Sequence, residues 1–199
     1  MTPIPDELLQ KPLALGTTKP SELKIKEIQD ELAKWHAEDQ AIQRAYYKDP
    51  NPKRREEADE VMSNNTAYLL ELVKEFGWID VERFGVEASS AAFLIVQHSG
   101  HIPMMRAALP AIEEDVKAKK LGSAAPYALL YDRLALQLGG KQRYGSQTCR
   151  DAHGDQVVRP LENPGKVDDF RKELGLVPLA EYLSFWEKKF GVKVKIPTE

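Results

Sequence analysis

The chain has 199 residues, 42% hydrophobic and 30% charged, so it can bury one ordinary core and is most simply a single domain. Its formal net charge of -3 is spread over segments of mixed sign without a basic stripe, which argues against nucleic acid as the main partner. The single cysteine, Cys149, excludes an internal disulfide, and the amino terminus has no apolar run long enough for a signal or membrane segment. We therefore expect a soluble, cytoplasmic protein with no membrane partner.

Two long amphipathic helices are expected after an extended N-terminal segment at residues 1–20. Apolar side chains recur at helical spacing over residues 21–47 and again over residues 56–76, where Gly77 ends the second helix. The proline-containing run at residues 49–52 separates the two helices.

Shorter helical segments follow. Residues 86–98 end in the run AAFLIVQH, which fits a buried helix or a short buried strand, and its length favours the helix. A helix from Pro103 to Lys120 is expected to kink or divide at Pro110, and another covers residues 127–138. Two closing helices, at residues 166–174 and 178–190, complete a single helical domain at 21–191 before a C-terminal tail at 192–199. The predicted fold is mainly α, with about six or seven helices.

The exception is residues 141–156, KQRYGSQTCRDAHGDQ, which have no apolar periodicity. Residues 142–149 and 156–161 are expected to pair as a short hairpin, so the helical domain carries a small loop or β-hairpin insert after Gly140.

Polar residues interrupt the apolar stripes of the predicted helices. Asp39 and Asn65 each occupy a stripe position, Asp132 and Arg133 are the only charges of an apolar helix, and the FLIV run ends in a Gln-His pair. Buried groups of this kind cost several kcal/mol unless they are paired and hydrogen-bonded, so we expect them to converge on one another.

The irregular stretch supplies further polar groups for such a cluster. Gln142, Tyr144 and Gln147 are expected to close over it, with Gly145 allowing the backbone to approach closely.

Each position also has a structural interpretation. Asp39 and Arg133 fit an ion pair between helices as well as a catalytic role, and Asn65 fits a hydrogen bond between helices. His98 fits a core histidine that donates to a carbonyl, and Tyr144 fits simple packing. The pair His98 and His101 lacks a clear third ligand, so we expect neither a metal site nor a cofactor.

The order of these elements resembles a bacterial family known only as a domain of unknown function. The similarity extends from about Glu31 to Tyr182. It rests on Glu38-Asp39-Gln40 with Arg44, Gly77-Trp78, Ile95-Val96-Gln97-His98, Arg106, Leu109-Pro110, Asp132-Arg133, Gln142-Arg143-Tyr144-Gly145-Ser146-Gln147, Val167-Asp168, Arg171, Gly175-Leu176 and Tyr182. The family motif more often has Thr at position 146, and Ser keeps the hydroxyl. The resemblance implies that the polar positions are signature positions, and it implies no reaction.

Two classes of function follow from the polar cluster. In the first, the protein is an enzyme on a small polar or anionic molecule, with His98 as general acid or base and Asp39 or Asp132 orienting it. The groups expected to bind the substrate are Gln97, Arg44, Arg133, Gln142, Tyr144 and Gln147. In the second, it is a non-catalytic interaction or immunity-type protein whose cluster is structural. A solvent-connected pocket that holds His98 beside a carboxylate favours the enzyme. The sequence leaves the oligomeric state open.

Overall fold

The computed structural model describes residues 13–49 and 51–196, and it forms two compact units, residues 13–121 and 122–196. We call these the N-terminal unit and the C-terminal unit and describe each by itself. Helices dominate the described chain, and the strands form one small sheet. The structure thus confirms a mainly α protein with a small β insert, whereas the single domain at 21–191 stays a prediction.

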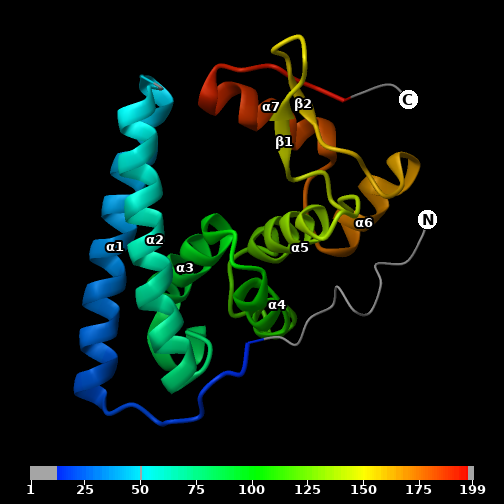
Figure 1. Cartoon of the computed structure of the whole chain (residues 1–199). Coiled ribbons are helices and arrows are strands. Elements are labelled where there is room, and N and C mark those ends of the chain that lie inside the picture. Colours follow the sequence, from blue (N-terminus) through cyan, green and yellow to red (C-terminus); the bar gives the residue numbers. More distant parts are fainter. Residues whose placement is uncertain (1–12, 50, 197–199) are drawn as a thin grey trace. The chain divides into compact units, whose positions relative to one another are not determined.

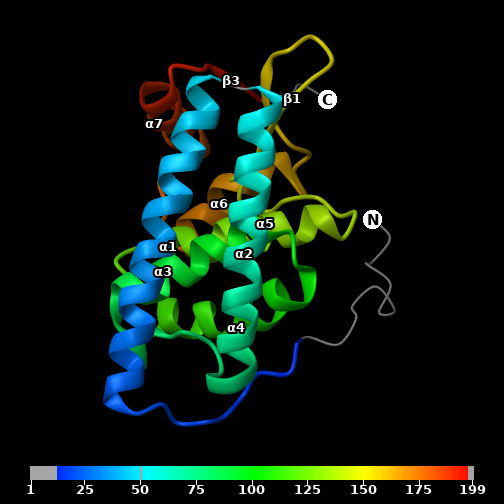
Figure 2. The same ribbon diagram turned by 60° about the vertical axis from the view of Figure 1, so that its left-hand side comes forward.

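The N-terminal unit consists of four helices, α1 (Glu22–Lys48), α2 (Pro52–Phe76), α3 (Val81–Ser99) and α4 (Ile102–Lys117). The long helices α1 and α2 lie side by side, both contact α3, and α3 also contacts α4 (Figures 1 and 2). Their apolar stripes meet in a core that includes Ile28, Leu32, Leu69, Val73, Ala92, Val96 and Met105.

The bounds of α2, α3 and α4 can be compared with those expected from the sequence. The Asn51 side chain accepts a hydrogen bond from the Arg54 amide, and Pro52 suits the first helical position, so α2 begins at Pro52 and not at residue 56. The AAFLIVQH run lies within α3, which confirms the helix rather than the strand. Helix α4 continues through Pro110 undivided and ends at Lys117.

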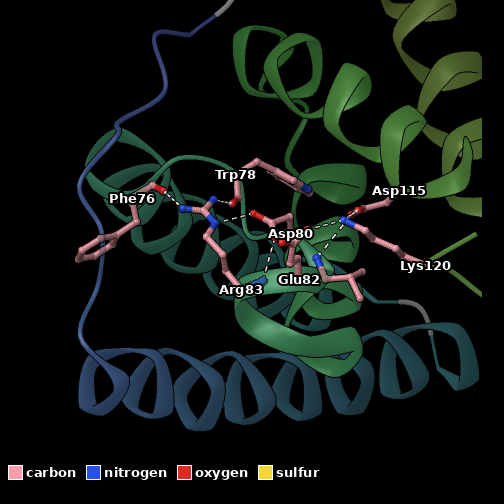
Figure 3. Close-up of polar contacts among 8 residues, drawn as sticks. Phe76, Trp78, Asp80, Glu82, Arg83, Asp115 and Lys120 are labelled. Atoms are coloured by element: carbon pink, nitrogen blue, oxygen red, sulfur yellow. Dashed lines mark hydrogen bonds and ion pairs between the residues drawn. The ribbon is translucent and has the colours of Figure 1, made fainter. Parts of the chain in front are cut away.

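Arg83 fastens the corner between α2 and α3 (Figure 3). Its guanidinium donates to the carbonyls of Phe76 and Trp78 and, from Nε, to the Asp80 carboxylate at 2.6 Å. The same carboxylate caps α3 by accepting from the Arg83 amide. One side chain therefore binds three acceptors from the segment that turns the chain, and this holds the first residues of α3 up to the kink at Gly85.

The C-terminal unit begins with α5 (Ala125–Gln137) and continues through a small sheet into two short helices. The strands are β1 (Thr148–Arg150), β2 (Gln156–Val158) and β3 (Val194–Lys195), in the order β1-β2-β3. The 3₁₀ turn η1 (Pro164–Lys166) precedes α6 (Val167–Glu173), and α7 (Leu179–Phe190) follows. Val158, Leu161, Val167, Leu179, Leu183 and Val194 form the apolar cluster that joins the sheet to α6 and α7.

The hairpin is shorter than the sequence predicts. Only three residues of each strand pair, with Thr148 opposite Val158, and Gln142 instead makes an isolated parallel bridge to Leu161. The strand β3, which pairs in parallel with β2, comes from the segment expected to be a C-terminal tail.

A substitution at Gly145 tests how tightly residues 141–156 pack against the rest of the C-terminal unit. Its φ is +69°, and a Cβ added there would lie 2.8 Å from Cδ1 of the buried Leu179. We expect Gly145→Ala to lower the free energy of unfolding by about 3 kcal/mol, because left-handed strain and overpacking add. Gly154 also has a positive φ, +83°, but no atom within 4 Å of the added Cβ. Gly154→Ala should therefore cost only about 1 kcal/mol. Equal losses in urea denaturation would contradict close packing at Gly145.

Candidate functional site

A histidine and a carboxylate face each other in the N-terminal unit. Asp39 lies on α1 and is only 6% exposed, whereas the side chain of His98, near the end of α3, is 27% exposed. His98 Nδ1 lies 3.5 Å from Asp39 Oδ2, which also accepts a hydrogen bond from Gln40 Nε2 at 3.1 Å. This separation is longer than a normal hydrogen bond, so the contact is mainly electrostatic.

The charge of Asp39 is stabilised by this neighbour. Burial raises the pKa of the Asp39 carboxyl, but the contact with His98, assisted by Gln40 and His36, outweighs burial and lowers this pKa below its ordinary value. Asp39 is therefore a carboxylate at neutral pH, as an orienting partner for a proton-transferring histidine has to be.

A pocket of about 530 Å³ opens beside His98. It is lined by Asp59, Met62, Ser63, Thr66, Ala67 and Leu70 of α2 and by His98, Ser99, Gly100 and His101. His98 is thus half-buried between a carboxylate and a solvent-connected space.

His101 has a structural role at the pocket rim. Its Nδ1 accepts a hydrogen bond from the Met104 amide and so caps α4. Within residues 13–49 and 51–196, no three His, Cys, Asp or Glu side chains are grouped as metal ligands would be.

The other polar residues predicted for the N-terminal unit lie outside the pocket lining. Gln97 and Asn65 are buried, and Arg44 is exposed on α1. Asn65 Oδ1 has no hydrogen-bond partner among the described residues, so the predicted hydrogen bond between helices is not seen at that atom.

In the C-terminal unit, Asp132 is bound by backbone amides. Its side chain is fully buried on α5, and Oδ1 accepts from the amides of Arg143 at 2.7 Å and Tyr144 at 3.0 Å. Its Oδ2 accepts from the Ser146 amide at 2.9 Å. Burial raises the pKa of the Asp132 carboxyl, against the opposing effect of these donors, which favour the charged form. Asp132 thus holds the irregular loop at residues 143–146 in place through its backbone amides.

Gln142 and Gln147 also bind backbone. Gln142 accepts from the Gln147 amide at 2.8 Å and donates to the carbonyls of Gln147 at 2.9 Å and Arg159 at 2.7 Å. Gln147 Nε2 donates to the carbonyl of Leu129 at 3.2 Å. A loop with no regular structure lacks the backbone hydrogen bonds that a neighbouring strand would supply. The side-chain amides of Gln142 and Gln147 supply such bonds here, so the two glutamines have a structural role in the fold.

Tyr144 packs edge-on against two other tyrosines. Its ring centroid lies 5.5 Å from that of Tyr131 and 6.2 Å from that of Tyr127. The contacts of Tyr144 are therefore those of a packed core residue, as its structural interpretation expected. Arg133 is half-buried on α5 and has an interaction partner.

The predicted site residues thus fall into two groups. Asp39, Gln97 and His98 belong to the N-terminal unit, and Asp132, Gln142 and Gln147 belong to the C-terminal unit. The expectation that both groups surround one site stays a prediction.

The sequence-based site omitted Arg171, although its family resemblance included this residue. Arg171 is buried on α6 and lines a pocket of about 250 Å³ together with Ser146 and Tyr182. A signal was present, because Arg171 follows Val167 by four residues and so occupies the apolar stripe of its helix.

These features describe a mainly helical protein with a His–Asp pair at a pocket. The chain matches a family described as a family of unknown function, DUF6624, over residues 26–195, and it belongs to this family. The comparison with curated proteins and the comparison with solved structures gave no match. No helix of the described residues is long and apolar enough to cross a membrane.

Asp132→Asn tests the role of this carboxylate in the loop. In the parent protein, the backbone amides of Arg143, Tyr144 and Ser146 donate to the two carboxylate oxygens of Asp132. In Asp132→Asn, an N–H₂ group replaces one of these oxygens and faces a backbone donor. We expect the free energy of unfolding to fall by about 3 kcal/mol, because at least one buried N–H loses its acceptor. Asp169→Asn, on the exposed side of α6, is the control and should change it by less than about 0.5 kcal/mol. Denaturant titration measures both, and a silent Asp132→Asn would contradict the assignment.

Asp39→Asn tests the electrostatic contact with His98. Because the folded-state pKa of Asp39 is lowered, its carboxylate stabilises the fold above the ordinary Asp pKa, and this stability is lost as pH falls through the folded pKa. We expect Asn to cost about 1–2 kcal/mol at pH 7. The difference from the parent should shrink below the ordinary Asp value of about 4. Denaturation between pH 7 and pH 3 measures it, with the exposed Asp30→Asn as control. A difference that does not depend on pH would contradict the charge effect.

Proposed function

We propose that the protein binds a small polar molecule in the pocket beside His98 and catalyses proton transfer on it with the Asp39–His98 pair. The observation that carries this proposal is the position of the His98 ring, with Nδ1 3.5 Å from a buried carboxylate and the side chain bordering the pocket. The proposal rests on the geometry of the N-terminal unit alone.

The two ring nitrogens of His98 take different roles in this proposal. Nδ1 faces Asp39, whose negative charge favours a protonated Nδ1 and stabilises the imidazolium that forms when the ring accepts a second proton. Nδ1 is buried and makes no full hydrogen bond, and no described residue is hydrogen-bonded to Nε2. Nε2 is then the atom that takes a proton from a bound hydroxyl, water or amine and returns it later.

The pocket lining indicates the class of molecule. Asp59, Ser63 and Thr66 offer oxygen atoms from α2, and the described lining contains no Lys or Arg. Such a lining suits a neutral or positively charged polar molecule better than an anion. The proposal therefore narrows the substrate expected from the sequence, a small polar or anionic molecule, to a polar one at this pocket.

The second candidate is a non-catalytic interaction protein whose polar groups are structural. The observation that favours it is the loop of the C-terminal unit, where Asp132 and Gln142 bind backbone groups and not solvent. The experiment on His98 separates the two candidates, because only the first needs a ligand and a turnover at the N-terminal pocket.

A library of polar metabolites, screened by thermal shift on the full chain, is the test of the first candidate. Molecules that raise the melting temperature are then incubated with the protein, and their conversion is followed by NMR. We expect His98→Ala to lower turnover by about 100-fold or more, the usual contribution of a general acid or base, with the far-UV circular dichroism spectrum unchanged. His153→Ala, at an exposed turn, is the matched control and should keep full turnover.

Two results would count against the proposal. Turnover that is equal in the parent and in His98→Ala would remove His98 from the chemistry. The absence of any stabilising ligand across the library would favour the interaction protein.

A further inference from the structure

The C-terminal unit contains a pocket whose chemistry differs from that of the His98 pocket. It has a volume of about 250 Å³ and lies between α5, the loop that carries Ser146, and the segment from Arg171 to Tyr182. Its apolar wall comes from Ala125, Ala128, Leu129, Leu176 and Val177. Among the described residues that line it, Arg171 is the only charged one.

Arg171 is held rigidly by backbone carbonyls. The residue is only 3% exposed, its Nε donates to the Val177 carbonyl at 2.6 Å, and its Nη1 donates to the Tyr144 carbonyl at 2.6 Å. The guanidinium carbon also lies 4.8 Å from the centre of the Tyr182 ring. These contacts fix the plane of the guanidinium without neutralising its charge.

No carboxylate in the described part of the chain lies within ion-pair distance of Arg171. Asp168 and Asp132 act on it only at longer range, and both are engaged elsewhere, Asp168 by the Leu179 amide and Asp132 by the loop amides. The third nitrogen of the guanidinium, Nη2, has no hydrogen-bond partner among the described residues. A buried cation with a free donor at a pocket is a costly arrangement unless an anion completes it.

We propose that this pocket binds a small organic carboxylic acid, with the carboxylate on Arg171 and an apolar body against α5 and Val177. One guanidinium matches the single charge of a carboxylate, whereas a phosphate dianion lacks a second cation in the lining. The apolar wall and the Tyr182 ring accommodate an aryl or branched alkyl group. The Ser146 hydroxyl also lines the pocket, but its one proton is donated to the Ala128 carbonyl at 3.4 Å, so it reaches the acid only by exchanging this long bond for one to the carboxylate.

The test is calorimetric titration of the full chain with benzoate and 3-methylbutanoate, with benzamide and inorganic phosphate as matched probes. We expect at least one of the two acids to bind saturably, with a dissociation constant at or below about 1 mM. Benzamide and phosphate should bind at least about tenfold more weakly, because the first lacks the charge and the second lacks the apolar body. Amide chemical shifts of Leu129, Ser146 and Val177 should move with the same affinity.

Three variants test whether the acid binds in this pocket. Arg171→Met should abolish binding, but it also leaves the carbonyls of Tyr144 and Val177 without their donor and therefore threatens the fold. Ala125→Leu fills the pocket and keeps Arg171, so it should weaken acid binding by at least about tenfold in a folded protein. Ala135→Leu, at a half-buried position of the same helix outside this lining, should leave the affinity within about twofold.

Three results would overturn the proposal. The first is that neither acid saturates the protein below about 5 mM, and the second is that benzamide binds as tightly as benzoate. The third is acid binding that Ala125→Leu leaves unchanged, because the acid would then occupy another site.

Discussion

The buried carboxylate of Asp132 is the contact on which the C-terminal unit depends. The loop between α5 and β1 has no ladder of its own, so its amides need acceptors, and Asp132 supplies them to Arg143, Tyr144 and Ser146. With the loop held in place, the Tyr144 carbonyl is positioned to receive Arg171. A chain of dependence thus leads from one side chain on α5 to the guanidinium at the pocket on α6.

The N-terminal unit also contains a buried carboxylate, but different groups stabilise it. Asp39 is nearly as deeply buried as Asp132, but its neighbours are side chains, His98 and Gln40, and not backbone amides. Backbone donors are fixed by the fold, whereas a histidine changes its charge near neutral pH. For this reason the proposed proton transfer is placed at Asp39 and His98, whereas the contacts of Asp132 are those of a residue that organises a loop.

Much of the helical architecture could be predicted from the spacing of apolar residues, because each stripe needs only its own helix to be recognised. The burial of Asp39 and Asn65 could be predicted in the same way, since each lies on a stripe, and that of Asp132 followed from the scarcity of charges on its helix. The partners of these residues were harder to predict, because Asp132 binds amides that become neighbours only when the loop folds back. Arg171 was missed although it shares a helix face with Val167, because a helix of seven residues shows this spacing only once. The start of α2 was missed because a run with two prolines usually separates helices, whereas after the Asn51 cap Pro52 suits the first helical position.

The distance between His98 and Asp39 depends on the direction of α3 after its kink at Gly85. Beyond the non-helical Gly85, α3 continues to Ser99, so His98 lies about 18 Å along the helix from Val86, the first residue after the kink, at the usual rise per residue. A tilt of about 5° there would carry the ring by about 1.5 Å over a helix of this length. His98 and Asp39 are separated by 3.5 Å, at the outer limit of a hydrogen bond, so a movement of that size decides whether the bond forms. The packing of α3 against α1 and α2 beyond the kink therefore sets the precision with which the histidine meets its carboxylate.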